Sequence, residues 1–286
     1  MTPAIWGVMA ALAWGSADFI ARFSGRAMGH YTALFGMLLT SAIIFSLIVT
    51  FSGQPLIWDT SGLGLLVVTG GGAMFGTLML YWGLARGPVT IVAPIAASYP
   101  LINIFYALFT GNNPSLLQWL AMAVVLGGVI IVAKCAKNFQ DDEEFSATEL
   151  KKTILISLAA AIAFGVTVIA LQEAGRIYGD LQTVFLARWI SLAAIIVVLL
   201  WRRERRPIPA RWWPLICLQG LLDGGAYTAL AIGGAATGGE IAAVIGSSFS
   251  AVTIILARWI LKEVMSGLQL LGVALIIVGV GVLLTP

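Results

Sequence analysis

Apolar residues along this 286-residue chain fall into ten stretches, separated by short segments rich in polar and turn-forming residues. A helix rises about 1.5 Å per residue, so a run of about 20 apolar residues crosses the roughly 30 Å hydrocarbon core of a bilayer. The pattern therefore predicts ten transmembrane helices. Their expected ranges are 3–23, 31–52, 62–85, 89–110, 115–134, 152–173, 181–201, 212–234, 240–260 and 266–285.

The second half of the chain repeats the first at a constant offset of 150 residues. Residues 10–15, AALAWG, match residues 160–165, AAIAFG. The same register holds for small and apolar residues over most of the two halves. Each half holds five expected spans, and an odd number of spans turns the second copy upside down relative to the first.

The pattern thus predicts an all-α polytopic membrane protein built as two inverted five-helix repeats around a central cavity. The first repeat covers 1–134 and the second 152–286, with a polar linker over 135–151. Inverted repeats of this kind are typical of secondary transporters, which bind their substrate near the midplane.

Composition agrees with a membrane protein and excludes other classes. Hydrophobic residues make up 60% of the chain and charged residues 10%, whereas a soluble domain carries about 25% charged residues. The net charge of +3 comes from basic residues in short loops, so it does not indicate a nucleic-acid partner. Cys135 and Cys217 are far apart and His30 is the single histidine. We therefore expect neither a metal site nor a cofactor.

The basic residues predict the orientation. Fourteen of the 16 lysines and arginines follow odd-numbered spans, whereas one, Arg176, lies on the opposite side. Cytoplasmic loops carry an excess of Lys and Arg. We therefore expect the linker, with the acidic run 141–144, in the cytoplasm and both termini outside.

Span four carries two helix breakers, Pro94 and Pro100. Each proline removes a backbone donor and favours a kink. The corresponding span nine has no proline but contains Gly246 followed by serines. Two interpretations stay open and are compatible: the breakers bend packed helices, or they form hinges around the substrate path.

Several aromatic and polar residues are expected near mid-depth. Trp14 and Phe164 are copies of each other, and Tyr99 is the copy of Phe249. Aromatic residues near span ends are commonly interfacial anchors, but Trp14 and Tyr99 lie too deep for that role and are expected to line a cavity for a flat apolar or cationic solute. The candidate substrate contacts are Trp14, Tyr81, Ser98, Tyr99, Asn103, Phe164 and Ser248.

Three charged residues fall within the spans: Asp18, Arg188 and Asp223. A central charge costs about 2.5–3.5 kcal/mol on an insertion scale, so each needs a partner or a function. Arg188 and Asp223 have similar depths and are expected to pair across two helices. The alternatives are that they bind the two ends of a zwitterion, or that Asp223 carries a coupling proton. Asp18 is a further candidate, or it pairs with Arg22 four residues on.

Other chemistry is missing from the sequence. Gly70, Gly71 and Gly72 resemble a phosphate-binding loop, but no Lys-Ser/Thr follows and the stretch lies inside an apolar span. A catalytic cluster does not occur, so an enzyme is not expected. A channel needs a continuous ring of polar pore-lining residues, whereas the polar residues here are scattered.

Short motifs resemble the EamA-type branch of the drug/metabolite transporter superfamily. Residues 13–16, AWGS, resemble the start of the family's first helix, and Gln269, Gly272 and Gly279 resemble its ending. Asn112, Ser250 and Lys262 depart from the family pattern.

Within the superfamily the chain is most similar to YddG-type exporters of aromatic amino acids. The resemblance implies export of amino acids, and of flat organic cations, across a bacterial inner membrane by alternating access. Carriers of nucleosides, sugar phosphates or purine-type solutes are the alternative. The expected partners are a small-molecule substrate and the lipid bilayer, and we expect the protein to work as a monomer.

Overall fold

The computed structural model describes residues 2–86, 92, 95–111, 114–134, 147–203, 207–260 and 266–284, and every regular element in these ranges is a helix. The first-half helices are α1 (Pro3–Met28), α2 (His30–Ser52), α3 (Leu63–Arg86), α5 (Pro100–Phe109) and α6 (Leu116–Lys134). The second-half helices are α7 (Ala147–Tyr178), α8 (Asp180–Arg202), α9 (Trp213–Ala235), α10 (Gly239–Gly246), α11 (Phe249–Ile260) and α12 (Gly267–Leu284), with a 3₁₀ turn at Ala210–Trp212. Among the described residues, six helices are long and apolar enough to cross a membrane, and four shorter apolar helices accompany them.

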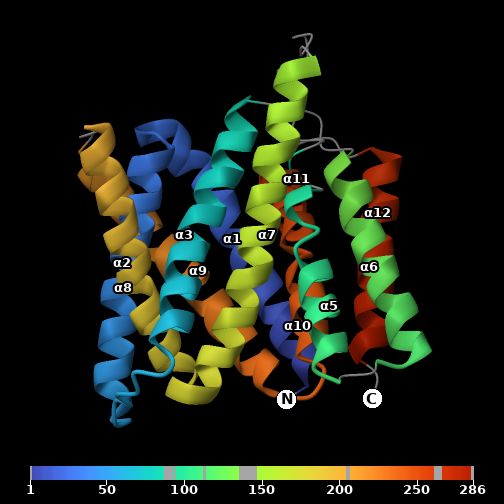
Figure 1. The fold of residues 1–286 in the computed structure, drawn as a ribbon. Helices are drawn as coiled ribbons and strands as arrows, with labels where there is room; N and C mark the ends of the chain where they lie inside the picture. The colour runs from blue at the N-terminus through green and yellow to red at the C-terminus, as the bar shows by residue number, and fades with distance from the viewer. Residues whose placement is uncertain are drawn as a thin grey trace.

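The two halves are inverted copies. Helix α1 begins at the end marked N in Figure 1, whereas its copy α7 begins at the opposite end. Helices α2 and α8 have bounds that differ by 150 residues at both ends, and α3 and α9 begin 150 residues apart. The described chain is therefore an all-helical polytopic fold with an internal twofold relation.

The corners between the first two helices of each repeat depend on glycine. Gly29 has φ 86° and ψ 152°, and its copy Gly179 has φ 79° and ψ 155°. This backbone region is essentially restricted to glycine. Each amide donates to the carbonyl of a second glycine four residues back, Gly25 or Gly175, at 2.9 Å. The same two residues thus end one helix and start the next in both repeats.

The repeats pack against each other through equivalent contacts. Helix α1 packs on α9 and α3 packs on α7, so each pair becomes the other when the halves are exchanged. A Cβ atom on Gly70 of α3 would lie 2.5 Å from the carbonyl oxygen of Ala187, and one on Gly220 of α9 would lie 2.7 Å from that of Met37. These positions are again 150 residues apart. Missing Cβ atoms therefore allow two further symmetry-related crossings, of α3 with α8 and of α9 with α2, to form closely.

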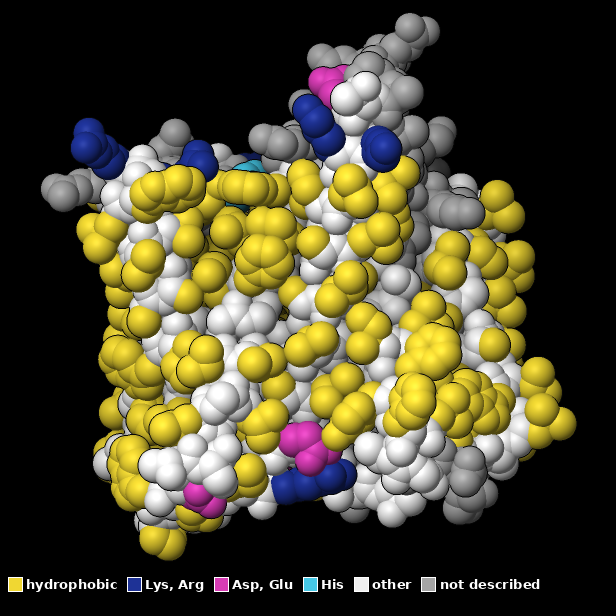
Figure 2. Space-filling view, in the orientation of Figure 1, with side chains coloured by type: hydrophobic (Ala, Val, Ile, Leu, Met, Phe, Trp, Pro, Cys, Tyr) yellow, Lys and Arg dark blue, Asp and Glu magenta, His cyan; other side chains and the backbone are white. Residues whose placement is uncertain are grey.

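Helices α6 and α12 lie side by side at one edge of the molecule (Figure 1). Their contact also depends on small residues, because a Cβ on Gly128 would lie 2.7 Å from the carbonyl oxygen of Gly272. Figure 2 shows apolar side chains over the wall of the molecule, with Lys and Arg mainly along the rim opposite the two termini and a smaller charged group at the other rim. This distribution is that of a protein embedded in lipid.

The expected spans differ from the helices in three respects. Span four was expected as one helix over 89–110, but α5 begins at Pro100, after a turn over 97–99. Spans one and six were expected to end at 23 and 173, but α1 and α7 continue to Met28 and Tyr178, because they stop only at the positive-φ glycines that follow. Span nine was expected as one helix over 240–260 and is instead divided into α10 and α11. The amide of Ser248 donates to Ile245, three residues back, and this tighter bond interrupts the α-helical ladder. The linker segment 135–146 lies outside the described residues.

Candidate functional site

Arg188 of α8 and Asp223 of α9 form an ion pair in the interior. Arg188 Nη1 lies 2.7 Å from Asp223 Oδ2, and only 3% of the arginine side chain and 14% of the aspartate side chain are exposed. Arg188 Nη2 also donates to the backbone carbonyl of Asp223 at 3.3 Å. The expected pair across two helices is therefore present, and each charge compensates the desolvation of the other.

Two aromatic residues hold this pair. The indole Nε1 of Trp14, on α1, donates to Asp223 Oδ1 at 3.2 Å. The guanidinium carbon of Arg188 lies 4.4 Å from the centre of the Tyr227 ring, in cation–π geometry. The rings of Trp14 and Tyr227 meet edge to face, with centroids 5.0 Å apart. Helices from both repeats thus contribute to one cluster of charged and aromatic groups.

Two aromatic contacts between the repeats are related by the internal symmetry. Trp14 meets Phe249 edge to face at 6.2 Å, and Phe164 meets Tyr99 edge to face at 6.3 Å. Trp14 corresponds to Phe164 and Phe249 to Tyr99 under the offset of 150 residues. The Tyr99 hydroxyl additionally donates to the carbonyl of Ala243 at 3.2 Å. We call these four rings together with Tyr227 the aromatic frame.

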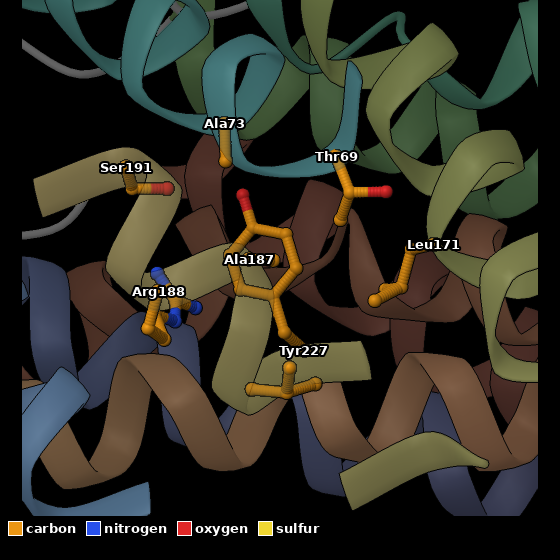
Figure 3. Close-up of a pocket in the computed structure, with 8 residues that line it drawn as sticks. Thr69, Ala73, Leu171, Ala187, Arg188, Ser191 and Tyr227 are labelled. Carbon is orange, nitrogen blue, oxygen red and sulfur yellow. The ribbon is translucent and has the colours of Figure 1, made fainter. Parts of the chain in front are cut away.

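A small cavity of about 10 Å³, room for a single water molecule, adjoins the ion pair (Figure 3). Its lining comes from α3, α7, α8 and α9 and consists of Thr69, Ala73, Leu171, Val184, Ala187, Arg188, Ser191 and Tyr227. The hydroxyls of Thr69 and Ser191 donate to the carbonyls of Leu65 and Gly70, at 2.8 and 2.7 Å. Ligand pockets typically measure about 300–1,000 Å³, so this conformation leaves too little room for a bulky solute.

The polar residues expected as substrate contacts have different surroundings. Ser98 Oγ donates to the carbonyl of Ile95 at 2.6 Å, within its own turn. Asn103 Nδ2 donates to the carbonyl of Gly165 at 3.2 Å, which joins α5 to α7, while its Oδ1 is buried without a hydrogen-bond partner. The Oγ of Ser248 is likewise buried without a partner. Asn103 and Ser248 therefore retain unused hydrogen-bonding capacity, and Ser98 does not donate to a ligand in this state.

Tyr81 and Asp18 lie at the margin of the site. The ring of Tyr81 packs 5.6 Å from that of His30 and against an apolar cluster of α2, α3, α7 and α8 that Phe164 also contacts. Tyr81 also interacts electrostatically with Asp18 and Asp223. Asp18 lies one helical turn from Trp14, is partly buried and interacts electrostatically with Asp223. The side chain of Arg22, its alternative partner, lies outside the described part of the chain.

The helix breakers lie at element ends. Pro100 is the first residue of α5, Gly246 is the last residue of α10, and Pro94 lies outside the described residues. A Cβ on Gly246 would lie 3.2 Å from Leu230 Cδ2 and in ordinary contact, at 3.6 Å, with the Tyr99 hydroxyl, so Gly246 lies directly beside the aromatic frame.

Comparison with known proteins identifies the family. The EamA-like transporter family matches residues 1–134 and 151–285, which is nearly the whole chain. The chain belongs to this family. It is therefore a membrane transporter of the drug/metabolite superfamily and not an enzyme.

The relatives of this EamA-like transporter agree with that assignment. A transporter of Synechocystis sp. described as uncharacterized is 25% identical over 247 residues, covering 80% of this chain and 67% of the relative. A second such transporter from the same organism is 31% identical over 136 residues, covering 46% of this chain and 40% of the relative. A protein of known crystal structure aligns with 99% of this chain and 96% of its own length, at a TM-score of 0.79 and 18% identity. That likeness shows a shared fold.

Sequence reasoning missed two members of the transporter's aromatic frame. Tyr227 follows Asp223 by four residues, the same spacing that separates Asp18 from Trp14, and residues so spaced lie on one face of a helix. This spacing therefore indicated Tyr227 as a neighbour of Asp223. Phe249 is the copy of Tyr99 and was a candidate on symmetry alone. The sequence could not identify Thr69, Leu171 and Ser191 as cavity-lining residues, because small polar and apolar residues occur throughout the spans.

Proposed function

We propose that this transporter exports neutral amino acids, aromatic ones among them, by alternating access of its two repeats. The observation that supports this proposal most directly is the aromatic frame, whose symmetric ring contacts join one repeat to the other beside a buried ion pair. Faces and edges of aromatic rings suit a flat apolar side chain. The resemblance to exporters of aromatic amino acids favours the same substrates.

The repeat interface supports alternating access. Contacts such as Trp14–Phe249 and Phe164–Tyr99 are equivalent under exchange of the halves, so two conformations that exchange the roles of the repeats have comparable energies. The small size of the cavity implies that helices must separate before a bulky solute enters. We propose that the interruptions near Pro94, Pro100 and Gly246 are the hinges.

Charge supports an orientation with both termini in the periplasm of a bacterial inner membrane. The repeats 1–134 and 152–286 are then joined by a cytoplasmic linker over 135–151, where four lysines lie at or near its ends. In the part of the chain that the structure describes, Lys and Arg gather mainly at the rim opposite the termini (Figure 2). We propose that a single chain is the working unit, since the central cluster draws its side chains from one chain.

Counterflow in proteoliposomes tests this function. Liposomes with the purified full-length protein are loaded with unlabelled L-phenylalanine and diluted into a trace of the labelled amino acid. A carrier gives a transient, saturable accumulation of label, because exchange is faster than net loss. Parallel assays use alanine, uridine, a sugar phosphate and a quaternary aromatic cation, each with and without a pH gradient.

The outcomes separate the alternatives. Counterflow of amino acids supports the proposal, and the pH gradient then shows whether protons are coupled. Counterflow of uridine or the sugar phosphate without that of any amino acid refutes it in favour of another metabolite carrier. A linear flux that does not saturate indicates a channel. Counterflow of the flat cation alone favours drug export, for which the carboxylates of Asp18 and Asp223 and the aromatic frame are suited.

A further inference from the structure

We infer that Arg188 and Asp223 recognise the two ends of a zwitterionic substrate, exchanging their mutual ion pair for one ion pair each with the ligand. The substrate's carboxylate binds Arg188 and its ammonium group binds Asp223, while the aromatic frame receives the side chain. This inference rests on the proposed function and names the chemistry by which the site selects amino acids.

Arg188 has an unused donor in the right place. Its side chain is 3% exposed and lines the cavity, yet its Nε is buried without a hydrogen-bond partner. An unsatisfied buried N–H on a charged group is costly and rare in a finished core. The edge of a guanidinium that carries Nε binds a carboxylate through two parallel hydrogen bonds. Arg188 therefore offers the geometry that a substrate carboxylate requires.

Asp223 is held in place without being fully satisfied. Trp14 donates to its Oδ1, whereas its Oδ2, although 2.7 Å from Arg188 Nη1, receives no aligned hydrogen bond. This oxygen has lone pairs available for an ammonium group. Asp18, one turn from Trp14 on α1, interacts electrostatically with Asp223 and so places a second carboxyl group close to it.

The ion pair between Arg188 and Asp223 explains why a ligand needs both an ammonium group and a carboxylate. When one member of a buried ion pair loses its partner, the remaining charge is left uncompensated in a medium of low polarity. A ligand that carries only an ammonium group displaces Arg188 from Asp223 and leaves the guanidinium unpaired. A ligand that carries only a carboxylate leaves Asp223 unpaired. A zwitterion compensates both charges, so the site discriminates by requiring the two together.

Competition with matched analogues tests this. Counterflow of labelled L-phenylalanine is measured in proteoliposomes with unlabelled L-phenylalanine, 2-phenylethylamine, 3-phenylpropanoate or L-phenylalaninamide as competitor. All four have the same ring, but only the first has both charges. We expect each of the other three to compete at least about tenfold more weakly. Competition by 2-phenylethylamine or 3-phenylpropanoate within about threefold of phenylalanine would overturn the inference.

Paired variants give a second, independent measurement. The double variant Arg188→Gln/Asp223→Asn keeps polar groups that can hydrogen-bond to each other but removes both charges. We expect it to lose at least about tenfold in apparent affinity for phenylalanine and to lose its preference over the three single-charge analogues. The matched control is Arg176→Gln/Glu173→Gln, which removes an ion pair of 2.9 Å at the surface and leaves the preference unchanged.

The results distinguish failure of the inference from failure of the proposed function. If the wild-type protein exchanges phenylalanine but the double variant does so with unchanged affinity, the pair is structural and the inference alone is wrong. If the double variant does not fold, the competition in the wild-type protein still decides. If the wild-type protein exchanges no amino acid at all, the proposed function is wrong and the inference fails with it.

Discussion

Replacing Trp14 by phenylalanine separates its hydrogen bond from its ring. The substitution removes the Nε1–H group that donates to Asp223 Oδ1 at 3.2 Å. It keeps an aromatic ring that can contact Tyr227 and Phe249, whose ring centroids lie 5.0 and 6.2 Å from that of the indole. Phenylalanine already occupies the symmetry-related position as Phe164, so this helix interface accommodates the smaller ring.

The size of the expected loss of affinity follows from the charge of the hydrogen-bond acceptor, Asp223. A hydrogen bond to a charged group contributes about 1.5–3 kcal/mol. Asp223 keeps its contacts with Arg188, and 14% of its side chain is exposed, so the lower end of this range applies. If the hydrogen bond positions the carboxylate for the substrate's ammonium group, about 1.5 kcal/mol corresponds to a loss of roughly tenfold in apparent affinity.

The assay is counterflow of L-phenylalanine at several concentrations, with the amount of reconstituted protein matched. The control is Trp189→Phe, which removes another indole hydrogen bond, from Nε1 to Ser46 Oγ at 3.0 Å, on an exposed face of α8. The control is expected to stay within about twofold of the wild-type protein, because the exposed Trp189 side chain and Ser46 are not part of the cavity lining. Equal apparent affinities for the Trp14 and Trp189 variants would refute the positioning role of the Trp14 hydrogen bond.

Three further predictions follow from the packing and the topology. Gly70→Ala is expected to lower the free energy of unfolding by about 1–3 kcal/mol, because the added Cβ would lie 2.5 Å from the Ala187 carbonyl oxygen. The control Gly71→Ala is expected to leave stability unchanged, because its Cβ would meet open space. Thermal unfolding in detergent compares the two variants, and equal midpoints would contradict the close crossing. Tyr99→Ala is expected to cost about fivefold in affinity for phenylalanine, from about 1 kcal/mol of ring contact, and less for alanine; a uniform slowing of both solutes points instead to a hinge. A cysteine placed within 141–144, with both native cysteines, Cys135 and Cys217, removed, is expected to resist an impermeant thiol reagent in intact cells and to react in inverted vesicles, and the opposite result reverses the topology.

The sequence alone was sufficient for the architecture, because lipid imposes a simple rule. Every backbone polar group in a bilayer must be paired within the chain, so apolar runs of about 20 residues are helices. The offset of 150 residues then predicted the inversion, and Gly29 and Gly179 carry the same backbone angles in both corners. Depth along the spans also placed Arg188 and Asp223 at similar levels, which predicted their pairing.

The sequence did not determine which helix faces meet. The chain has no strict apolar and polar alternation within its spans, because both lipid and protein interior accept apolar side chains. Only the tertiary structure showed that the Arg188 guanidinium lies over the Tyr227 ring and that the Tyr81 ring packs against His30. The break between α10 and α11 falls at Gly246 and the serines that follow it, which the sequence had marked as a helix breaker; whether the breaker would bend or interrupt the helix was decided by the tertiary structure.

Local patterns therefore determined the helical class, the approximate course of the helices and how the halves are related, since these depend on hydrophobicity, chain length and glycine geometry. The composition of the central cluster was decided by packing between segments as distant as Trp14 and Asp223, 209 residues apart in the chain. Such contacts depend on the rotation of each helix about its axis. That rotation is selected by close crossings such as the one at Gly70, which exist only once both helices are in place.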